Sequence, residues 1–125
     1  MEKSKVYFCD MRAKPGMSLL DKLKKLMNAA GIGEIDMEKK FVAIKIHFGE
    51  PGNLSYLRPN FAKAVAEVVK ARGGMPFLTD CNTLYGGRRK TARDHLEAAW
   101  ENGFTPLSCG CPVLIADGLK GTDEV

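Results

Sequence analysis

The chain has 125 residues, of which 45% are hydrophobic and 27% charged, and it carries a formal net charge of +4. This composition is typical of one globular domain and excludes a disordered chain. The charge is mild, and the basic run at residues 88–90 lacks the interleaved aromatic side chains of single-stranded nucleic-acid binders, so nucleic acid is disfavoured as a partner.

The sequence shows no membrane or export signal. No apolar run reaches the roughly 20 residues that a helix needs to cross a bilayer, and the N-terminus lacks the apolar core of a signal peptide. We therefore expect a cytoplasmic protein without a membrane partner.

The first third of the chain predicts one strand and one helix. Residues 5–9 are β-branched and aromatic, which predicts a first strand. Ser18 and Asp21 have the spacing of a capping box at a helix start, with Asp in place of the usual Glu or Gln. Apolar residues then recur at helical spacing until Gly31 ends the helix.

The remaining two thirds continue the alternation. Residues 41–48 give the strongest strand signal, and a helix then starts near Pro59. Residues 76–79 predict a third strand, Thr91 begins a third helix, and residues 112–116 predict a fourth strand. The apolar stripe expected on the third helix consists of Leu96, Ala99 and Trp100.

This β-α-β-α-β-α-β order predicts an α/β fold. Strands that alternate with helices form a mostly parallel sheet with helices on both faces, which is a three-layer sandwich. We expect a single domain over residues 1–125. We also expect its ligand site at the carboxyl ends of the strands, where open α/β sheets bind their ligands.

The segments after the second and third strands are rich in glycine and in side chains that can donate or accept protons. We expect them to contain the ligand-binding residues Glu50, Asn53, Asn82, Tyr85, Gly86, Gly87 and Arg88.

Three residues at these strand ends are candidates for catalysis. Lys45 and His47 are two residues apart and project from the same face of a strand, so a buried Lys45 would need a partner or a cavity and His47 could transfer a proton. Asp80 lies where the third strand meets its loop. The alternative is structural: an edge strand with Lys45 reaching solvent and His47 bonded to backbone, and Asp80 as a loop cap.

The loop that leads into the third helix could hold a small anionic ligand. Gly86 and Gly87 would let backbone amides curl around an anion at the helix N-terminus, and Arg88 could clamp a phosphate or carboxylate. The alternative is a flexible loop with solvated charge.

The spacing of the cysteines does not predict a metal site in the chain. Cys9, Cys81, Cys109 and Cys111 are expected to be free thiols, and a lone C-x-C pair lacks the partners that a zinc or iron–sulfur site requires.

Three segments resemble a known family, the prokaryotic "Fe–S center" proteins that contain the domain of unknown function DUF362. They cover residues 45–53, 78–88 and 116–125. The resemblance implies that the chain is the N-terminal part of a longer protein whose missing C-terminal part carries a ferredoxin-like iron–sulfur cluster. That iron–sulfur domain would be a partner of this one. No cluster motif, and so no cofactor ligand, occurs in the present residues.

Three alternatives follow. The first is a ligand- or substrate-binding α/β domain of an iron–sulfur, redox protein, with Lys45, His47 and Asp80 transferring protons. The second is a non-catalytic binding or regulatory module that recognises an anionic partner through residues 86–88. The third is a fragment that only scaffolds the iron–sulfur domain. The residues specify neither a reaction nor an oligomeric state.

Overall fold

The computed structural model describes residues 3–123. The chain divides into two compact units, Met1–Asp36 and Met37–Val125. No helix among the described residues combines the length and the apolar character that a membrane crossing needs.

The first unit contains helix α1 (Leu19–Ala29) and the short 3-10 helix η1 (Ile32–Glu34). The predicted capping box is confirmed: the Asp21 N–H donates to the Ser18 hydroxyl at 3.1 Å, and the Ser18 N–H donates to the Asp21 carboxylate at 2.9 Å. The predicted strand at residues 5–9 is wrong. Its β-branched and aromatic residues favour an extended chain, but strand residues are stabilised by cross-strand neighbours, and no strand within the described residues pairs with this segment.

The second unit contains a parallel sheet of three strands in the order β1-β2-β3, namely β1 (Phe41–Lys45), β2 (Met75–Asp80) and β3 (Val113–Ile115). The predicted α/β class and the parallel pairing are confirmed. Strand β1 is shorter than the expected 41–48, although the Ile46 N–H still donates to the Thr79 carbonyl at 3.1 Å. His47 therefore lies in the loop that follows, just past the end of the ladder.

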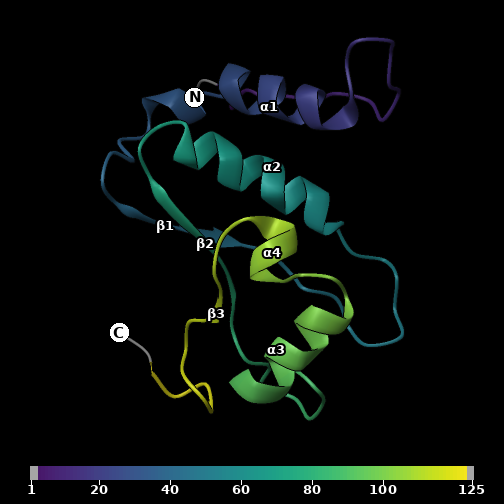
Figure 1. Cartoon of the computed structure of the whole chain (residues 1–125), viewed down its shortest axis with the longest axis vertical. Coiled ribbons are helices and arrows are strands. Elements are labelled where there is room, and N and C mark those ends of the chain that lie inside the picture. Colours follow the sequence, from purple (N-terminus) through teal and green to yellow (C-terminus); the bar gives the residue numbers. More distant parts are fainter. Residues whose placement is uncertain (1–2, 124–125) are drawn as a thin grey trace. The chain divides into compact units, whose positions relative to one another are not determined.

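Helices α2 (Pro59–Lys70), α3 (Ala92–Glu101) and α4 (Pro106–Cys109) connect these strands (Figure 1). The predicted starts are confirmed, because α2 has a proline in its first turn and the Thr91 side chain caps α3. Helix α4 was not predicted. Its four residues are too few to show a helical period, although a capping box between Thr105 and Ser108 marks its start.

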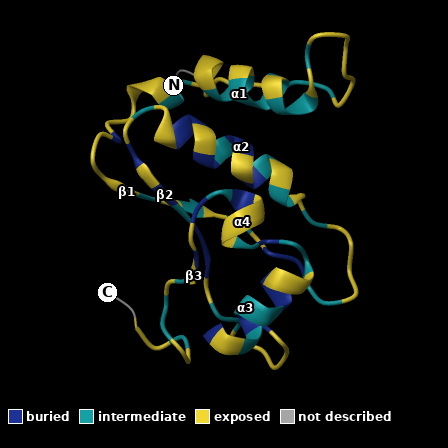
Figure 2. Cartoon of the chain, in the orientation of Figure 1, coloured by how far each residue is buried: buried dark blue, intermediate teal, exposed yellow. Residues whose placement is uncertain are grey.

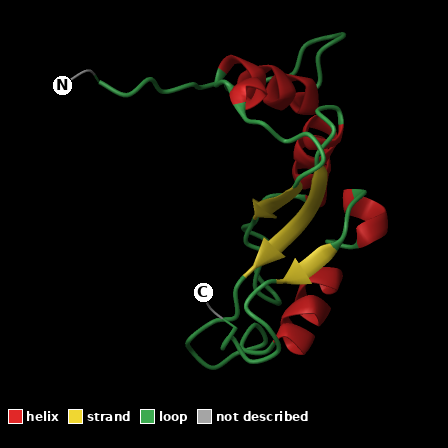
Figure 3. Ribbon diagram, turned by 90° about the vertical axis from the view of Figure 1, so that its left-hand side faces the viewer, coloured by secondary structure: helices red, strands yellow, loops and turns green. Residues whose placement is uncertain are grey.

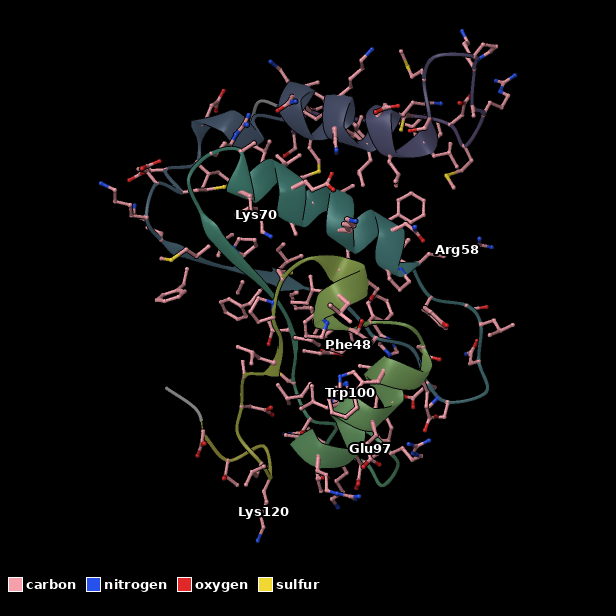
Figure 4. The ribbon with its side chains drawn as sticks, viewed as in Figure 1. Phe48, Arg58, Lys70, Glu97, Trp100 and Lys120 are labelled. Atoms are coloured by element: carbon pink, nitrogen blue, oxygen red, sulfur yellow. The ribbon has the colours of Figure 1, made fainter. Side chains whose placement is uncertain are left out.

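The core of the second unit lies between one face of the sheet and these helices. Paired positions Ile44, Leu78 and Val113 share that face. Phe48, labelled in Figure 4, has no exposed surface, and Figure 2 shows buried residues on α2, α3 and α4. The expected stripe of α3 is partly wrong, because Trp100 is 50% exposed. The buried positions of this helix are Ala92, His95, Ala98 and Ala99.

The opposite face of the sheet carries apolar side chains that the second unit does not cover. Phe41 at 79% and Leu114 at 48% exposure lie on this face, while Figure 3 shows α3 and α4 on the other side of the strands. Within residues 37–123 the helices thus form one layer on the sheet, so the predicted three-layer order is only partly realised there.

Gly49 forms a tight corner that directs the chain from β1 to Glu50. Gly49 and Gly52 both adopt left-handed backbone conformations, with φ of 85° and 83°. A methyl group at residue 49 would lie 2.6 Å from both Asn102 Nδ2 and Tyr56 Cδ1, whereas one at residue 52 would meet nothing within 4 Å. Asn102 also donates to the Phe48 carbonyl at 2.9 Å, so the corner is held on both sides.

We expect Gly49→Ala to destabilise the protein more than Gly52→Ala. Both variants incur a left-handed backbone cost of about 1–2 kcal/mol, and Gly49→Ala adds an overpacking cost of about 1–3 kcal/mol. Urea denaturation of the two variants measures the difference. Equal losses would show that the corner adapts and that close packing does not fix it.

Candidate functional site

A buried carboxylate stands at the carboxyl end of β2. The side chain of Asp80 is 7% exposed. Its Oδ1 accepts the Cys81 N–H at 2.9 Å and lies 3.1 Å from Lys45 Nζ. Its Oδ2 lies 3.4 Å from Arg89 Nη1 and 3.7 Å from His95 Nε2. One carboxylate thus joins the end of β1, the loop before α3 and α3 itself.

Arg89 is the second buried charge, with a side chain that is 6% exposed. Its Nε donates to Glu50 Oε1 at 2.7 Å and its Nη2 donates to the Tyr85 hydroxyl at 2.7 Å. The Tyr85 hydroxyl in turn donates to Glu50 Oε1 at 3.1 Å. The hydrogen bond from Arg89 holds the pKa of the Glu50 carboxyl below its usual value. Glu50, Tyr85 and Arg89 therefore form a closed network beside Asp80.

Lys45 is the exposed member of this cluster. Its side chain is 65% exposed because β1 is an edge strand and Lys45 ends it. The structure therefore agrees with the edge-strand alternative for Lys45, and the aliphatic stem carries the ammonium group to the Asp80 carboxylate. The ammonium is open to solvent on one side and to a buried anion on the other.

His47 lies on the wall of a cavity of about 450 Å³ next to this cluster. Its Nδ1 accepts the Gly49 N–H at 2.9 Å, so the proton of the neutral ring is on Nε2. Several candidate residues meet at this cavity. Its polar wall consists of His47, Glu50, Asn53, Ser55, Tyr85 and Arg89.

The anion-binding residues that were predicted in the loop before α3 do not line this cavity. Arg88 binds Glu101 of α3 through two hydrogen bonds of 2.7 Å, and Gly86 and Gly87 are exposed. In the first turn of α3, the Ala92 N–H donates to the Leu119 carbonyl at 3.1 Å. The arginine that reaches the cluster is Arg89, the next residue along the chain.

Asn82 belongs to a second cavity of about 570 Å³, at the carboxyl ends of β2 and β3. Its backbone N–H donates to the Asp117 carboxylate, and its Nδ2 donates to the same carboxylate at 3.0 Å and to the Gly118 carbonyl at 2.8 Å. Asn82 thus ties the loops after β2 and β3 together, and its role in ligand binding stays a prediction.

Sequence reasoning missed Arg89 and His95 as members of the cluster. Adjacent arginines at a turn point in different directions, and nothing in the residue types distinguishes Arg88 from Arg89. His95 did carry a signal, because it stands three residues after Ala92 and four before Ala99 and so shares their buried helix face.

The cysteines of the second unit do not converge. Cys81 follows β2, whereas Cys109 and Cys111 precede β3 at the opposite end of the parallel sheet. Burial raises the pKa of both Cys109 and Cys111, which keeps them as neutral thiols. Within residues 3–123 no group of three or more His, Cys, Asp or Glu side chains could hold a metal ion, so these residues do not fit an iron–sulfur cluster.

The fold and the cluster define an α/β domain with a charged site at the carboxyl ends of its parallel strands. Residues 42–125 match the family described as Domain of unknown function (DUF362), and the chain belongs to this family. The match lies within the second unit and includes all the residues of the cluster. No curated protein and no solved structure was found to match the chain.

We expect Arg89→Met to destabilise the protein by about 3–5 kcal/mol, the cost of leaving a buried charge without its partner. Arg88→Met is the matched control and should have little effect, because both members of the Arg88–Glu101 pair are exposed to water. Chemical denaturation of both variants measures the difference. Similar losses for the two variants would contradict the role of Arg89 as a buried, paired charge.

We also expect stability to depend on the proton of His95. Burial lowers the pKa of His95 in the folded chain, and Asp80 only partly opposes this effect. As the pH falls below about 6.5, the unfolded chain takes up this proton first, so the free energy of unfolding decreases by at most about 1.4 kcal/mol per pH unit until the folded pKa is passed.

Unfolding at a series of pH values tests this expectation, and His95→Gln should flatten the slope. His47→Gln removes the other histidine of the chain and serves as the control that keeps the slope. A slope that survives in His95→Gln would assign it to other groups.

Proposed function

We propose that the carboxyl ends of β1 and β2 bind a small ligand with an anionic group, and that the ammonium of Lys45 contacts this group. The observation that supports the proposal is the position of Lys45, which is an exposed cation fixed on a buried carboxylate. Water can reach the ammonium, whereas Asp80 and Arg89 beneath it are almost completely buried.

The cluster consists of a fixed part and an exposed cation. The frame is the hydrogen-bonded set of Arg89, Glu50 and Tyr85, and the exposed cation, or arm, is Lys45. Lys45 and Arg89 balance Asp80 and Glu50, so the cluster has no net charge when each group is ionised. Each of the three guanidinium nitrogens of Arg89 already donates a hydrogen bond, to Glu50, Tyr85 or Asp80. Arg89 therefore holds the frame in place, and Lys45 is the cation that can exchange an internal partner for an external one.

The adjoining cavity offers further donors and matches a small molecule in size. A volume of about 450 Å³ falls in the range of roughly 300–1,000 Å³ typical of small-molecule sites. The His47 Nε2–H, whose tautomer is set by Gly49, can donate to a ligand oxygen. The wall of the cavity also contains Ile46, Tyr56 and Leu57, so a ligand with an apolar part beside its charged group fits this cavity best.

Lys45 and Asp80 also form an acid–base pair that is suited to proton transfer. Their atoms are 3.1 Å apart, which is within the reach required for a proton to pass between them or through a bound ligand. We propose proton transfer as the chemistry of this site. We further propose that an iron–sulfur redox domain works beside this site, a proposal supported by the resemblance of residues 45–53, 78–88 and 116–125 to iron–sulfur proteins.

The alternative of a non-catalytic module that binds an anionic partner through residues 86–88 has less support. Its clamp residue, Arg88, is bound to Glu101 and would have to give up two hydrogen bonds of 2.7 Å to engage a partner.

Titration with inorganic phosphate and with acetate, followed by two-dimensional NMR, tests the proposal. We expect one or both anions to shift the amide signals of residues 45–50 and 80–82, and we expect Lys45→Ala to weaken binding by about tenfold, the loss of one charge-assisted contact. Lys90→Ala removes an equal charge from the exposed loop and is the control. Equal affinities for Lys45→Ala and Lys90→Ala would contradict the proposal.

A further inference from the structure

His95 is fully buried, and neither of its ring nitrogens has a hydrogen-bond partner among the described residues. A neutral imidazole always carries one N–H and one acceptor nitrogen, and burying either without a partner is costly. A buried residue with both nitrogens in this condition is uncommon in native proteins and requires an explanation. Its ring makes a T-shaped contact with the ring of Phe48, at a centroid distance of 5.8 Å.

The nearest acceptor is the Asp80 carboxylate. Asp80 Oδ2 is 3.7 Å from His95 Nε2, which is slightly too far for a hydrogen bond. The other oxygen of the same carboxylate is held by Lys45 and by the Cys81 N–H. The carboxylate thus stands between an outer cation and an inner ring, and a displacement of a few tenths of an ångström inward would give His95 Nε2 a hydrogen-bond partner.

We propose that His95 is a positioning residue for Asp80, which shifts onto His95 Nε2–H when an anionic ligand engages Lys45. The inference rests on the proposed function, because the ligand supplies the negative charge that releases Lys45 from Asp80. In this state both Lys45 and Asp80 keep a partner. The unmade hydrogen bond of the free protein is then made only when the site is occupied.

The charges around His95 are compatible with this exchange. Asp80 from β2 and Asp117 after β3 favour a proton on the ring, whereas Arg89 and His47 oppose it. Burial lowers the pKa of His95, so the ring is a neutral donor and the shift needs no proton uptake. As Asp80 approaches, the pKa of His95 must rise, because the carboxylate stabilises the protonated ring.

Removal of the outer cation imitates the ligand and tests the inference on the intact chain. Nitrogen-15 NMR of the histidine ring reports its tautomer and its titration. In Lys45→Ala we expect the Nε2–H tautomer to dominate, a slowly exchanging low-field proton to appear, and the pKa of His95 to shift upward relative to the wild type. Lys90→Ala removes one charge without touching Asp80 and should leave the ring signals unchanged. Identical ring signals in the two variants would overturn the inference.

Addition of inorganic phosphate to the wild type should produce the same changes as Lys45→Ala. If phosphate produces no change while Lys45→Ala does, the positioning role stands and the proposed anion site is wrong. His95→Phe should weaken phosphate binding by about tenfold, and His95→Gln, which retains a donor, should restore most of it. Wild-type affinity in His95→Phe would overturn the positioning role even if that site binds phosphate.

Discussion

The side-chain carboxylate of Asp80, almost removed from water at the end of β2, is the constraint on which the site depends. A buried carboxylate is tolerated only when hydrogen bonds and opposite charges replace its hydration. Asp80 obtains these partners from its own neighbour, the Cys81 amide, and from two other parts of the chain, because Lys45 ends β1 and Arg89 precedes α3. Satisfying one charge therefore fixes the positions of the segments that surround the cavity.

The same constraint divides the cluster by accessibility. Arg89, Glu50 and Tyr85 are connected to one another and form a frame, and the exposed Lys45 is attached to it through Asp80. A frame that is already satisfied does not have to reorganise when a ligand arrives, which limits the cost of binding. The sheet face with Phe41 and Leu114, which the rest of the second unit does not cover, is a separate feature that the cluster does not explain.

The elements with strong periodic signals could be predicted from the sequence, and those that depend on tertiary partners could not. Helices α1 and α3 begin at their predicted caps, α2 begins at the predicted Pro59, and the first five residues of the apolar run at 41–48 form β1. Residues 5–9 have strand-forming side chains but no strand beside them among the described residues. The location of the site could also be predicted, because a parallel sheet brings the carboxyl ends of its strands together at one edge. This rule selects Lys45, His47 and Asp80. The choice between Arg88 and Arg89 depends on how one turn is oriented, which residue types do not reveal.

Selective acylation of lysines tests most directly the central claim that Lys45 is an exposed cation held on the buried carboxylate of Asp80. The intact protein is treated with a limiting amount of an amine-reactive reagent with and without inorganic phosphate, and the modification of each lysine is quantified by mass spectrometry. The account predicts that phosphate slows the modification of Lys45 while that of Lys90 and Lys120 is unchanged. Equal slowing at all three lysines, or none at Lys45, would contradict it.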